Sequence, residues 1–334
     1  MIDRETLIGN FLARAGWGDA TRSILADDAS FRRYERLIQG GRRVVLMDAP
    51  PPKEDVRPFI HIDRLLRHMG LSAPEILAED VQAGLLLLED LGDSTYTRVL
   101  ADGGDEATLY GLALDLLIAL HRRFEGDDTL PPYDEEAFLT EATLLTDWYM
   151  PAISGRETAP ALRDEYRDLW RSALAEARRM PATLVLRDYH VDNMIWLPDR
   201  PGVAACGLLD FQDARLGPLT YDLVSLFEDA RRDVPPALAA KFLDRYLDAF
   251  PELDREDFAA SYAIMGAQRS AKILGIFTRL DRRDGKPTYL THIPRVWRWL
   301  EGDLAHPVLA DLRTWFEREL PPKTRITPAP GEKS

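Results

Sequence analysis

The first ninety residues of the chain mix helical and strand-like hydrophobic spacing. Apolar side chains recur at helical intervals over residues 3–15 and 54–70, and a glycine follows each stretch. Glycines 40 and 41 mark a hairpin turn between two of the strand-like runs. Those runs cover residues 22–26, 30–39, 42–49, 75–79 and 84–89. This pattern predicts a small lobe of antiparallel strands with an inserted helix.

From about residue 93 the spacing becomes helical. Helices are predicted over residues 105–123, 134–149, 160–179, 219–231, 236–249, 254–280 and 305–318. A strand-rich window at 184–210 interrupts them, and residues 321–334 lack apolar periodicity, which predicts a disordered tail. We therefore predict an α+β, bilobal chain. A small β-rich N-terminal lobe (1–90) precedes a larger, mostly helical C-terminal lobe (91–320).

The strand-rich window places polar side chains at the open end of a predicted hairpin. Two apolar runs, 194–197 and 206–210, flank a segment rich in Pro, Gly and Asp. Pairing Leu197 with Cys206 would put Asn193 opposite Asp210. Amide and carboxylate oxygens are the hard ligands that Mg²⁺ prefers. A magnesium site is therefore predicted there.

Asp188 precedes Asn193 by five residues and lies near the same end of the predicted hairpin. The spacing D-x-x-x-x-N, followed by an Asp in a D-F-x setting, is the pattern of phosphoryl-transfer enzymes of the protein-kinase type. In that chemistry an Asp takes the proton of the acceptor hydroxyl beside two magnesium ligands. The alternative is that all three are ordinary turn and strand-end residues, which the joint arrangement disfavours.

The composition of the chain limits the classes of partner that it is expected to bind. The 334 residues include 42 Lys and Arg against 56 Asp and Glu, a net charge of −14, which argues against nucleic acid or an anionic membrane. The single cysteine, Cys206, can form neither an intrachain disulfide nor a cysteine-based zinc site. No apolar run approaches the roughly 18 residues of a membrane span. We expect a soluble, cytoplasmic protein that meets a polyanionic substrate with a metal or a few local cations.

Several segments together carry a family resemblance. They are ASFRRYERL (29–37), VVLMDAPPPKED (44–55), LLLEDLGD (86–93), TDWYMP (146–151), RDYHVDNM (187–194), LLDFQDARLGPLTYDLVSL (208–226) and QRSAKILGIFTRL (268–280). The chain resembles the aminoglycoside phosphotransferase family, small-molecule kinases related to choline kinase with the bilobal protein-kinase-like fold. Within it, the chain looks most like the bacterial kinases that phosphorylate N-acetylmuramate and N-acetylglucosamine at C1 in cell-wall recycling.

The resemblance implies ATP and Mg²⁺ as cofactors and assigns roles to residues. Asp188 would be the catalytic base, and Asn193 and Asp210 the magnesium ligands. Segment 27–34 would be the loop over the ATP phosphates, and the backbone of 89–91 the hinge that binds adenine. The cofactor-binding candidates are Ser30, Phe31, Arg32, Arg33, Glu89 and Leu91.

One departure from the kinase pattern concerns the third strand. Kinases usually carry there a Lys that pairs with the ATP phosphates, whereas this strand has Met47 or a neighbour at that position and no Lys. A cation must come from elsewhere, and Arg32 and Arg33 are the candidates. The alternative is that both are solvated charges.

A sugar pocket needs polar groups for hydroxyls and an aromatic face for the ring. Arginines near the site would suit the lactyl carboxylate of N-acetylmuramate. The substrate candidates are Trp148, Tyr149, His190, Gln212, Asp213, Arg215 and Arg269. Core packing is the alternative for the aromatics, and a surface position for the arginines. Asp222, at a predicted helix start, is interpreted as a structural cap that supports the catalytic loop.

The sequence thus predicts an ATP- and Mg²⁺-dependent kinase acting on the anomeric hydroxyl of an amino sugar. Three alternatives stay open. They are another kinase of the family (aminoglycoside, choline or homoserine), a nucleotide-binding module without transfer activity, and a metallohydrolase built on His190 and Asp192. The preferred sugar, its anomer and the oligomeric state are left open.

Overall fold

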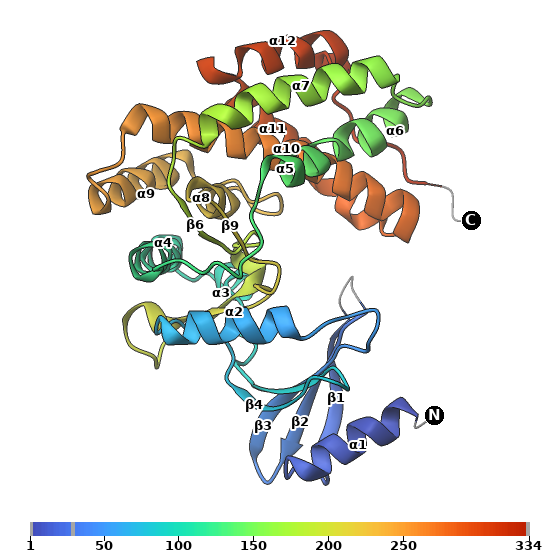
Figure 1. Cartoon of the computed structure of the whole chain (residues 1–334), viewed down its shortest axis with the longest axis vertical. Helices are drawn as coiled ribbons and strands as arrows, with labels where there is room; N and C mark the ends of the chain where they lie inside the picture. Colours follow the sequence, from blue (N-terminus) through green and yellow to red (C-terminus); the bar gives the residue numbers. More distant parts are fainter. Residues whose placement is uncertain (1–2, 28–30, 332–334) are drawn as a thin grey trace. The chain divides into compact units, whose positions relative to one another are not determined.

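The computed structural model describes residues 3–27 and 31–331, and the chain forms two compact units (Figure 1). One unit, here called the sheet unit, comprises Met1–Arg123 and Val191–Ala214. The other, called the helical unit, comprises Phe124–His190 and Arg215–Ser334. The segment that follows the Asp188 loop therefore belongs with the N-terminal strands and not with the residues next to it in sequence.

A five-stranded antiparallel sheet forms the centre of the sheet unit. The strand order is β1-β2-β3-β5-β4. The strands are β1 (Thr21–Asp27), β2 (Arg33–Gln39), β3 (Arg42–Asp48), β4 (Ile76–Asp80) and β5 (Leu85–Glu89). Gly40 and Gly41, with φ of 60° and 78°, form the β2–β3 turn. Such a turn requires a left-handed backbone at both central positions, which glycine adopts without steric cost. The predicted hairpin is therefore confirmed.

Helices and a second hairpin complete the sheet unit. The helices are α1 (Arg4–Arg14), α2 (Arg57–His68), α3 (Tyr96–Ala101) and α4 (Glu106–Arg123). The hairpin strands are β7 (Met194–Trp196) and β8 (Cys206–Leu208). Asp3 caps α1 by accepting the Thr6 N–H, and the apolar face of α1 packs on the sheet. The two helices predicted in the N-terminal lobe are therefore both present.

The helical unit carries most of the remaining helices. They are α5 (Glu135–Ala142), α6 (Met150–Ser154), α7 (Pro160–Ala177), α8 (Thr220–Phe227), α9 (Pro236–Ala249), α10 (Arg255–Asp284), α11 (Ile293–Leu304) and α12 (Ala310–Glu319). The short strands β6 (Ala182–Val185) and β9 (Arg215–Pro218) pair antiparallel. The helix predicted over 134–149 is broken by a π-helical turn at Leu145–Tyr149, and α11 was not predicted. Among the described helices, none has both the length and the apolar character needed to cross a membrane.

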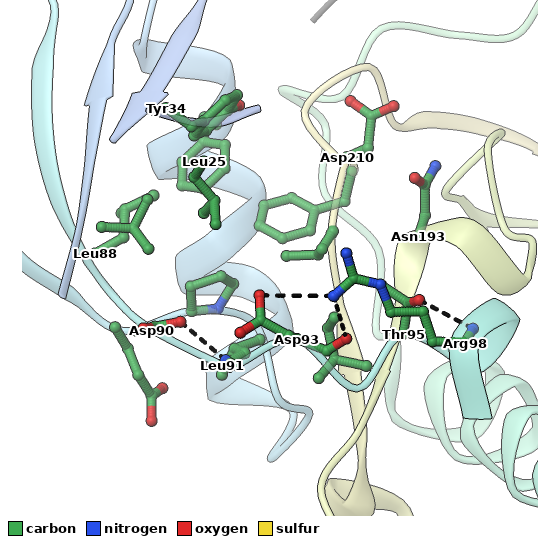
Figure 2. Close-up of a pocket in the computed structure, with 18 residues that line it drawn as sticks. Leu25, Tyr34, Leu88, Asp90, Leu91, Asp93, Thr95, Arg98, Asn193 and Asp210 are labelled. Atoms are coloured by element: carbon green, nitrogen blue, oxygen red, sulfur yellow. Dashed lines mark hydrogen bonds and ion pairs between the residues drawn. The ribbon is translucent and has the colours of Figure 1, made fainter. Parts of the chain in front are cut away.

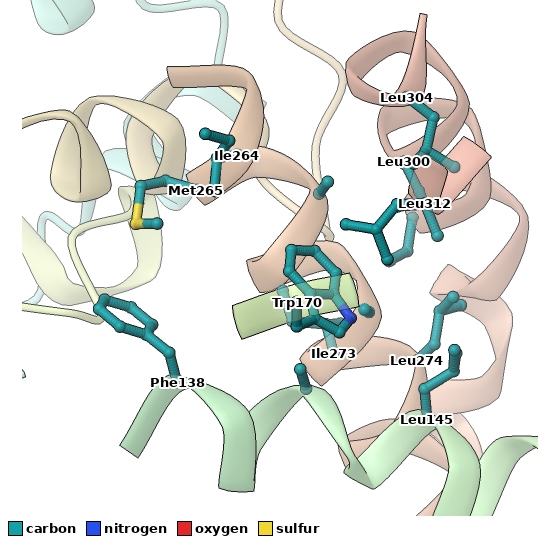
Figure 3. Close-up of a cluster of buried hydrophobic side chains, with 14 of the residues drawn as sticks. Phe138, Leu145, Trp170, Ile264, Met265, Ile273, Leu274, Leu300, Leu304 and Leu312 are labelled. Atoms are coloured by element: carbon teal, nitrogen blue, oxygen red, sulfur yellow. The ribbon is translucent and has the colours of Figure 1, made fainter. Parts of the chain in front are cut away.

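Helix α10 runs through the core of the helical unit (Figure 3). Ile264, Met265 and Leu274 of this helix lie in one cluster with the fully buried Trp170 of α7. Gly275 has no room for a side chain, since a Cβ there would come within 2.3 Å of the Leu144 backbone. The buried helix thus provides a rigid support for any polar side chain that it carries.

Residues 321–331 lie against this unit, although their sequence predicted disorder. The Tyr149 hydroxyl donates to the Ile326 carbonyl at 2.8 Å, and the Gly331 N–H donates to Asp281 Oδ2 at 2.9 Å. The Arg282 guanidinium donates to the Ala329 carbonyl at 2.9 Å. These contacts are long-range hydrogen bonds, which apolar periodicity does not reveal.

Candidate active site

A cavity of about 450 Å³ lies in the sheet unit (Figure 2). Its wall is mainly apolar, with polar groups at a few points, as is typical of small-molecule sites. The lining includes Leu25, Tyr34, Val45, Phe59, Leu88, Leu91, Ile195, Leu209 and Phe211, together with Glu89, Asp90, Asn193 and Asp210. The predicted hinge and the two predicted magnesium ligands therefore line one cavity.

The segment after β5 is fixed beside this cavity. The Arg36 guanidinium of β2 pairs with Asp90 at 2.8 Å and with Asp93 at 2.9 Å, and this pairing lowers the pKa of Asp93. In the part of the chain that the structure describes, the Leu91 N–H has no hydrogen-bond partner. The Glu89 carboxylate is engaged by Arg200, and the Glu89 N–H donates to the Glu75 carbonyl at 2.8 Å, which leaves the Leu91 N–H as the donor that a ligand can meet. This is the arrangement that a hinge for a flat heterocycle needs.

The predicted hairpin is present, but its register differs by one residue from the prediction. Met194 pairs with Leu208, and the Leu209 N–H donates to the Asn193 carbonyl at 2.9 Å. Asn193 is thus opposite Leu209 and not opposite Asp210. The connecting segment contains a 3-10 turn at Gly202–Ala205, and this turn moves the pairing along the second strand.

Asn193 and Asp210 nevertheless reach the same cavity. The Asp210 backbone is left-handed, with φ of 58°, so the chain turns out of the strand there. Phe211, the next residue, packs its ring 4.9 Å from that of Phe59 on α2. Figure 2 shows both oxygen-bearing side chains on the side of the cavity opposite Leu88.

These two side chains fit a magnesium ion. Their oxygens are hard ligands, and Mg²⁺ commonly takes one or two protein groups together with phosphate oxygens and water. Gln212 donates to Asp210 Oδ1 at 2.8 Å, and the Asp210 side chain is 43% exposed. The described residues contain no cluster of three or more His, Cys, Asp or Glu suited to a metal. The metallohydrolase alternative therefore finds no support in them.

The loop that carries Asp188 belongs to the helical unit and is held by α8. Asp222 accepts the Leu186 N–H at 2.6 Å and the Arg187 N–H at 2.9 Å. Ser225 donates to the Arg187 carbonyl at 3.2 Å, and Arg187 has a left-handed φ of 71°. Burial raises the pKa of Asp222 to about 7, although both backbone N–H groups favour the ionised form. Asp222 therefore supports the loop, as the sequence interpretation proposed, but it does not cap α8, whose N-cap residue is Leu219.

The surroundings of Asp188 favour its ionised form. Burial alone would raise the pKa of Asp188, but the charges of Lys272, and then of His190, Arg269 and Arg187, together outweigh it and hold that pKa below its usual value. Lys272 is itself engaged, at 3.2 Å from both Glu141 and the Tyr221 hydroxyl. Arg187 also pairs with Glu141, at 2.6 Å. A carboxylate that stays ionised at neutral pH suits a proton acceptor.

The substrate candidates fall in different surroundings. Tyr149 is fully buried, and its hydroxyl is hydrogen-bonded to the Trp297 indole and the Ile326 carbonyl, which favours the alternative of core packing for this aromatic residue. Trp148 is half-buried beside it. His190 is buried, with Nε2 3.5 Å from an Arg231 nitrogen.

The remaining substrate candidates are four. Gln212 is bonded to Asp210, and Asp213 is exposed. Arg215 donates to the Pro132 carbonyl at 3.0 Å. Arg269 is 5% exposed, and its side chain forms no hydrogen bond or ion pair with any described residue.

The phosphate-loop candidates also differ. Ser30 lies outside the described residues. Phe31 is exposed, with the Lys53 ammonium 4.2 Å from its ring centre. The Arg32 side chain is only 11% exposed, whereas Arg33 is exposed.

Sequence reasoning missed three charged residues that organise these sites. Lys272 and Glu141 form a buried ion pair near Asp188, and Arg36 pairs with Asp90 in the predicted hinge segment. A signal was present for Lys272, which directly precedes the apolar run 273–277 of a buried helix. A charged residue in such a stretch needs a partner, and its position indicates a polar cluster.

Comparison with known proteins places the chain in a family. The model of the phosphotransferase enzyme family matches residues 21–259. The chain belongs to this family of phosphotransferase enzymes.

Individual relatives are similar over nearly their whole length. The chain is 40% identical to an N-acetylmuramate/N-acetylglucosamine kinase from Caulobacter vibrioides, an alignment that covers 97% of this chain and 98% of the relative. It is also 40% identical to the Pseudomonas aeruginosa protein of the same name, over 92% of each.

Solved structures agree in fold. The choline kinase LicA from Streptococcus pneumoniae superposes with a TM-score of 0.62 at 14% identity, covering 90% of this chain and 99% of that one. The aminoglycoside phosphotransferase APH(2")-IIa, in a ternary complex with streptomycin and ATP, gives 0.57 at 15% identity, covering 92% of this chain and 98% of that one. The predicted protein-kinase-like α+β fold is therefore confirmed.

Proposed function

We propose that this chain transfers the γ-phosphoryl group of ATP to the anomeric C1 hydroxyl of N-acetylmuramate, N-acetylglucosamine or both, in peptidoglycan recycling. The observation that carries the proposal is the 40% identity to the Caulobacter vibrioides kinase across almost the whole of both chains. The fold alone would not support so narrow a proposal, because one fold hosts many reactions.

The cavity of the sheet unit supports ATP as the donor. Solved relatives include LicA with AMP and the aminoglycoside kinase complex with ATP. Val45, Leu88 and Leu209 offer apolar walls for a purine, and the Leu91 N–H offers a donor at its edge. These are the contacts that adenine recognition needs.

The chemistry then follows from three side chains. Asn193 and Asp210 would hold Mg²⁺, which when bound neutralises charge on the β- and γ-phosphates. Asp188 would accept the proton of the C1 hydroxyl as its oxygen bonds to the γ-phosphorus. The bond from that phosphorus to the bridging oxygen breaks, and ADP leaves with the electron pair. The lowered pKa of Asp188 supports this role, because the base is ionised before the reaction begins.

Two residues near Asp188 support an acceptor that is not cationic. Arg269 is a nearly buried cation without an ion pair among the described residues, and its charge acts on Asp188. Such a guanidinium suits the lactyl carboxylate of N-acetylmuramate and would repel choline or an aminoglycoside. His190, also buried beside Asp188, offers a polar ring to the sugar hydroxyls.

An acceptor panel tests the proposal. Purified protein is mixed with Mg²⁺, ATP and one acceptor at a time, and ADP is measured against a blank without acceptor. The acceptors are N-acetylmuramate, N-acetylglucosamine, choline, homoserine and an aminoglycoside. We expect ADP with the N-acetylated amino sugars alone. ADP with choline or an aminoglycoside alone, or with no acceptor, would overturn the proposal.

A further inference from the structure

Strand β3 supplies no positive charge to the nucleotide cavity at the position where kinases carry their lysine. Val45 lines the cavity, and Met47, two residues along on the same face, is 1% exposed. A methionine cannot neutralise a phosphate. The charge that the β- and γ-phosphates of ATP need must therefore come from another element of the sheet unit.

Arg32 is the cation that the structure turns inward. It directly precedes β2, yet its side chain is 11% exposed. Its Nη2 lies 4.0 Å from Oδ1 of Asp210, the candidate magnesium ligand. The neighbouring Arg33 is exposed, and it begins the strand opposite Asp48. Of two adjacent arginines, one is thus directed to the metal side of the cavity.

Glu54 fixes Arg32 in this position. Its Oε2 lies 3.7 Å from Arg32 Nε, and its Oε1 accepts the Phe31 N–H at 3.0 Å. One carboxylate therefore holds both the backbone and the side chain of this short stretch. Glu54 itself is 19% exposed and precedes α2, whose Phe59 packs on Phe211, the residue after Asp210. The pair is thereby tied to the same elements that position the metal ligand.

We propose that Arg32, held by Glu54, provides the positive charge on the β- and γ-phosphates of ATP that a strand lysine provides in other kinases. The Arg32–Glu54 pair thus replaces the lysine–glutamate pair of the kinase fold. A guanidinium offers two parallel donors to phosphate oxygens, so it can serve as well as an ammonium group. This inference rests on the proposed function only in taking ATP as the nucleotide.

Calorimetric titration of the full chain tests the role of Arg32 without relying on turnover. Mg²⁺–ATP and AMP are each titrated into the wild-type protein, Arg32→Gln, Arg32→Lys and the matched control Arg33→Gln. We expect Arg32→Gln to weaken ATP binding about 10- to 100-fold, the range for losing a charge-assisted hydrogen bond, and to leave AMP affinity within about twofold. Arg32→Lys should recover part of the loss, and Arg33→Gln should change ATP affinity by less than about threefold.

A double-mutant cycle tests whether Glu54 acts on ATP binding through Arg32. Glu54→Gln should weaken ATP binding several-fold in the wild-type background and have no further effect in Arg32→Gln. The proposal is overturned if Arg32→Gln binds ATP as the wild type does, if it loses AMP to the same degree, or if the two substitutions add independently. Thermal unfolding of each variant excludes misfolding as the cause. A wild-type protein that binds ATP in this way but phosphorylates no sugar would contradict the proposed function and leave this inference standing.

Discussion

Asp222 accepts the backbone N–H of Arg187 at 2.9 Å with one carboxylate oxygen, while its other oxygen accepts the N–H of Leu186. Arg187 has a left-handed backbone, which a non-glycine residue adopts at a cost of about 1–2 kcal/mol. The loop that presents Asp188 is therefore held in a conformation that it would not adopt unaided. Helix α8 acts on the site through this contact, without being a candidate ligand to any reactant.

Replacing this carboxylate should loosen the loop. Asp222→Asn keeps the volume but puts an amide N–H₂ against a backbone donor, so one buried N–H loses its acceptor. We expect the free energy of unfolding to fall by about 1–3 kcal/mol and turnover to fall with it. Urea unfolding and steady-state kinetics measure both. Ser225→Ala, which removes only the 3.2 Å bond to the Arg187 carbonyl, is the milder control. Unchanged stability and turnover in Asp222→Asn would show that the loop holds its own shape.

Removing the base should separate chemistry from binding. Asp188→Asn cannot accept the proton of the acceptor hydroxyl, so we expect turnover to fall by about 10²- to 10⁴-fold. ATP affinity, measured by calorimetry, should stay within a few-fold of the wild-type value, because the variant keeps the nucleotide cavity of the sheet unit intact. A variant with wild-type turnover would remove Asp188 from the mechanism.

The charge of Lys272 should be visible in the pH profile. Lys272 is the strongest of the charges that lower the pKa of Asp188. Lys272→Met removes it, so the pKa of Asp188 rises and the base becomes protonated at a higher pH. As the pH falls from 8 to 4.5, kcat/KM should therefore decline earlier in the variant than in the wild type. An acid limb at the same pH in both proteins would contradict this electrostatic role.

A pair of buried carboxyl groups should make stability depend on pH. Burial raises the pKa of Glu228 from 4.5 to about 7, and burial next to Glu228 raises the pKa of Asp303 well above its usual value. Between about pH 4.5 and pH 7, the folded protein therefore keeps protons on these carboxyl groups that the unfolded chain has released. The free energy of unfolding therefore falls as the pH rises from about 4.5 to 7.

The double variant Glu228→Gln/Asp303→Asn tests this relation. Its loss of stability between pH 5 and 7.5 should be smaller than that of the wild type by at least about 2 kcal/mol, the contribution of Glu228 alone, since each unit of pKa shift is worth about 1.4 kcal/mol. Urea unfolding at both pH values measures the difference. Asp222, whose pKa burial also raises, is present in both proteins and cancels. Equal losses would mean that folding does not raise the pKa values of Glu228 and Asp303.

Much of the fold could be predicted from local patterns in the sequence. The strands of the five-stranded sheet, the turn at Gly40 and Gly41, and helices α1 and α2 follow from period and turn chemistry. The hairpin that carries Asn193 was also predictable, because apolar runs flank a turn-rich segment. The register of this hairpin was not predictable, because it depends on the number of residues in the connecting segment that form the 3-10 turn at 202–205.

Features that depend on long-range contacts could not be read from the sequence. Tyr149 looked like a pocket residue, but its hydroxyl is engaged by Trp297 and by a carbonyl 177 residues away. The same bond secures the segment that was predicted to be disordered. The grouping of 191–214 with the N-terminal strands rests on bridges such as Ser72 with Gly207. Side-chain types and spacing contain no information about such pairings.

The most direct test of the central claim is the structure of the product. Purified enzyme, Mg²⁺, ATP and N-acetylmuramate or N-acetylglucosamine are allowed to react, and the product is examined by proton-coupled phosphorus NMR. The account predicts a sugar phosphate whose phosphorus couples to the single anomeric proton at C1. Coupling to the two protons of C6 would contradict the anomeric assignment, and the absence of any sugar phosphate from either acceptor would contradict the proposed function as a whole.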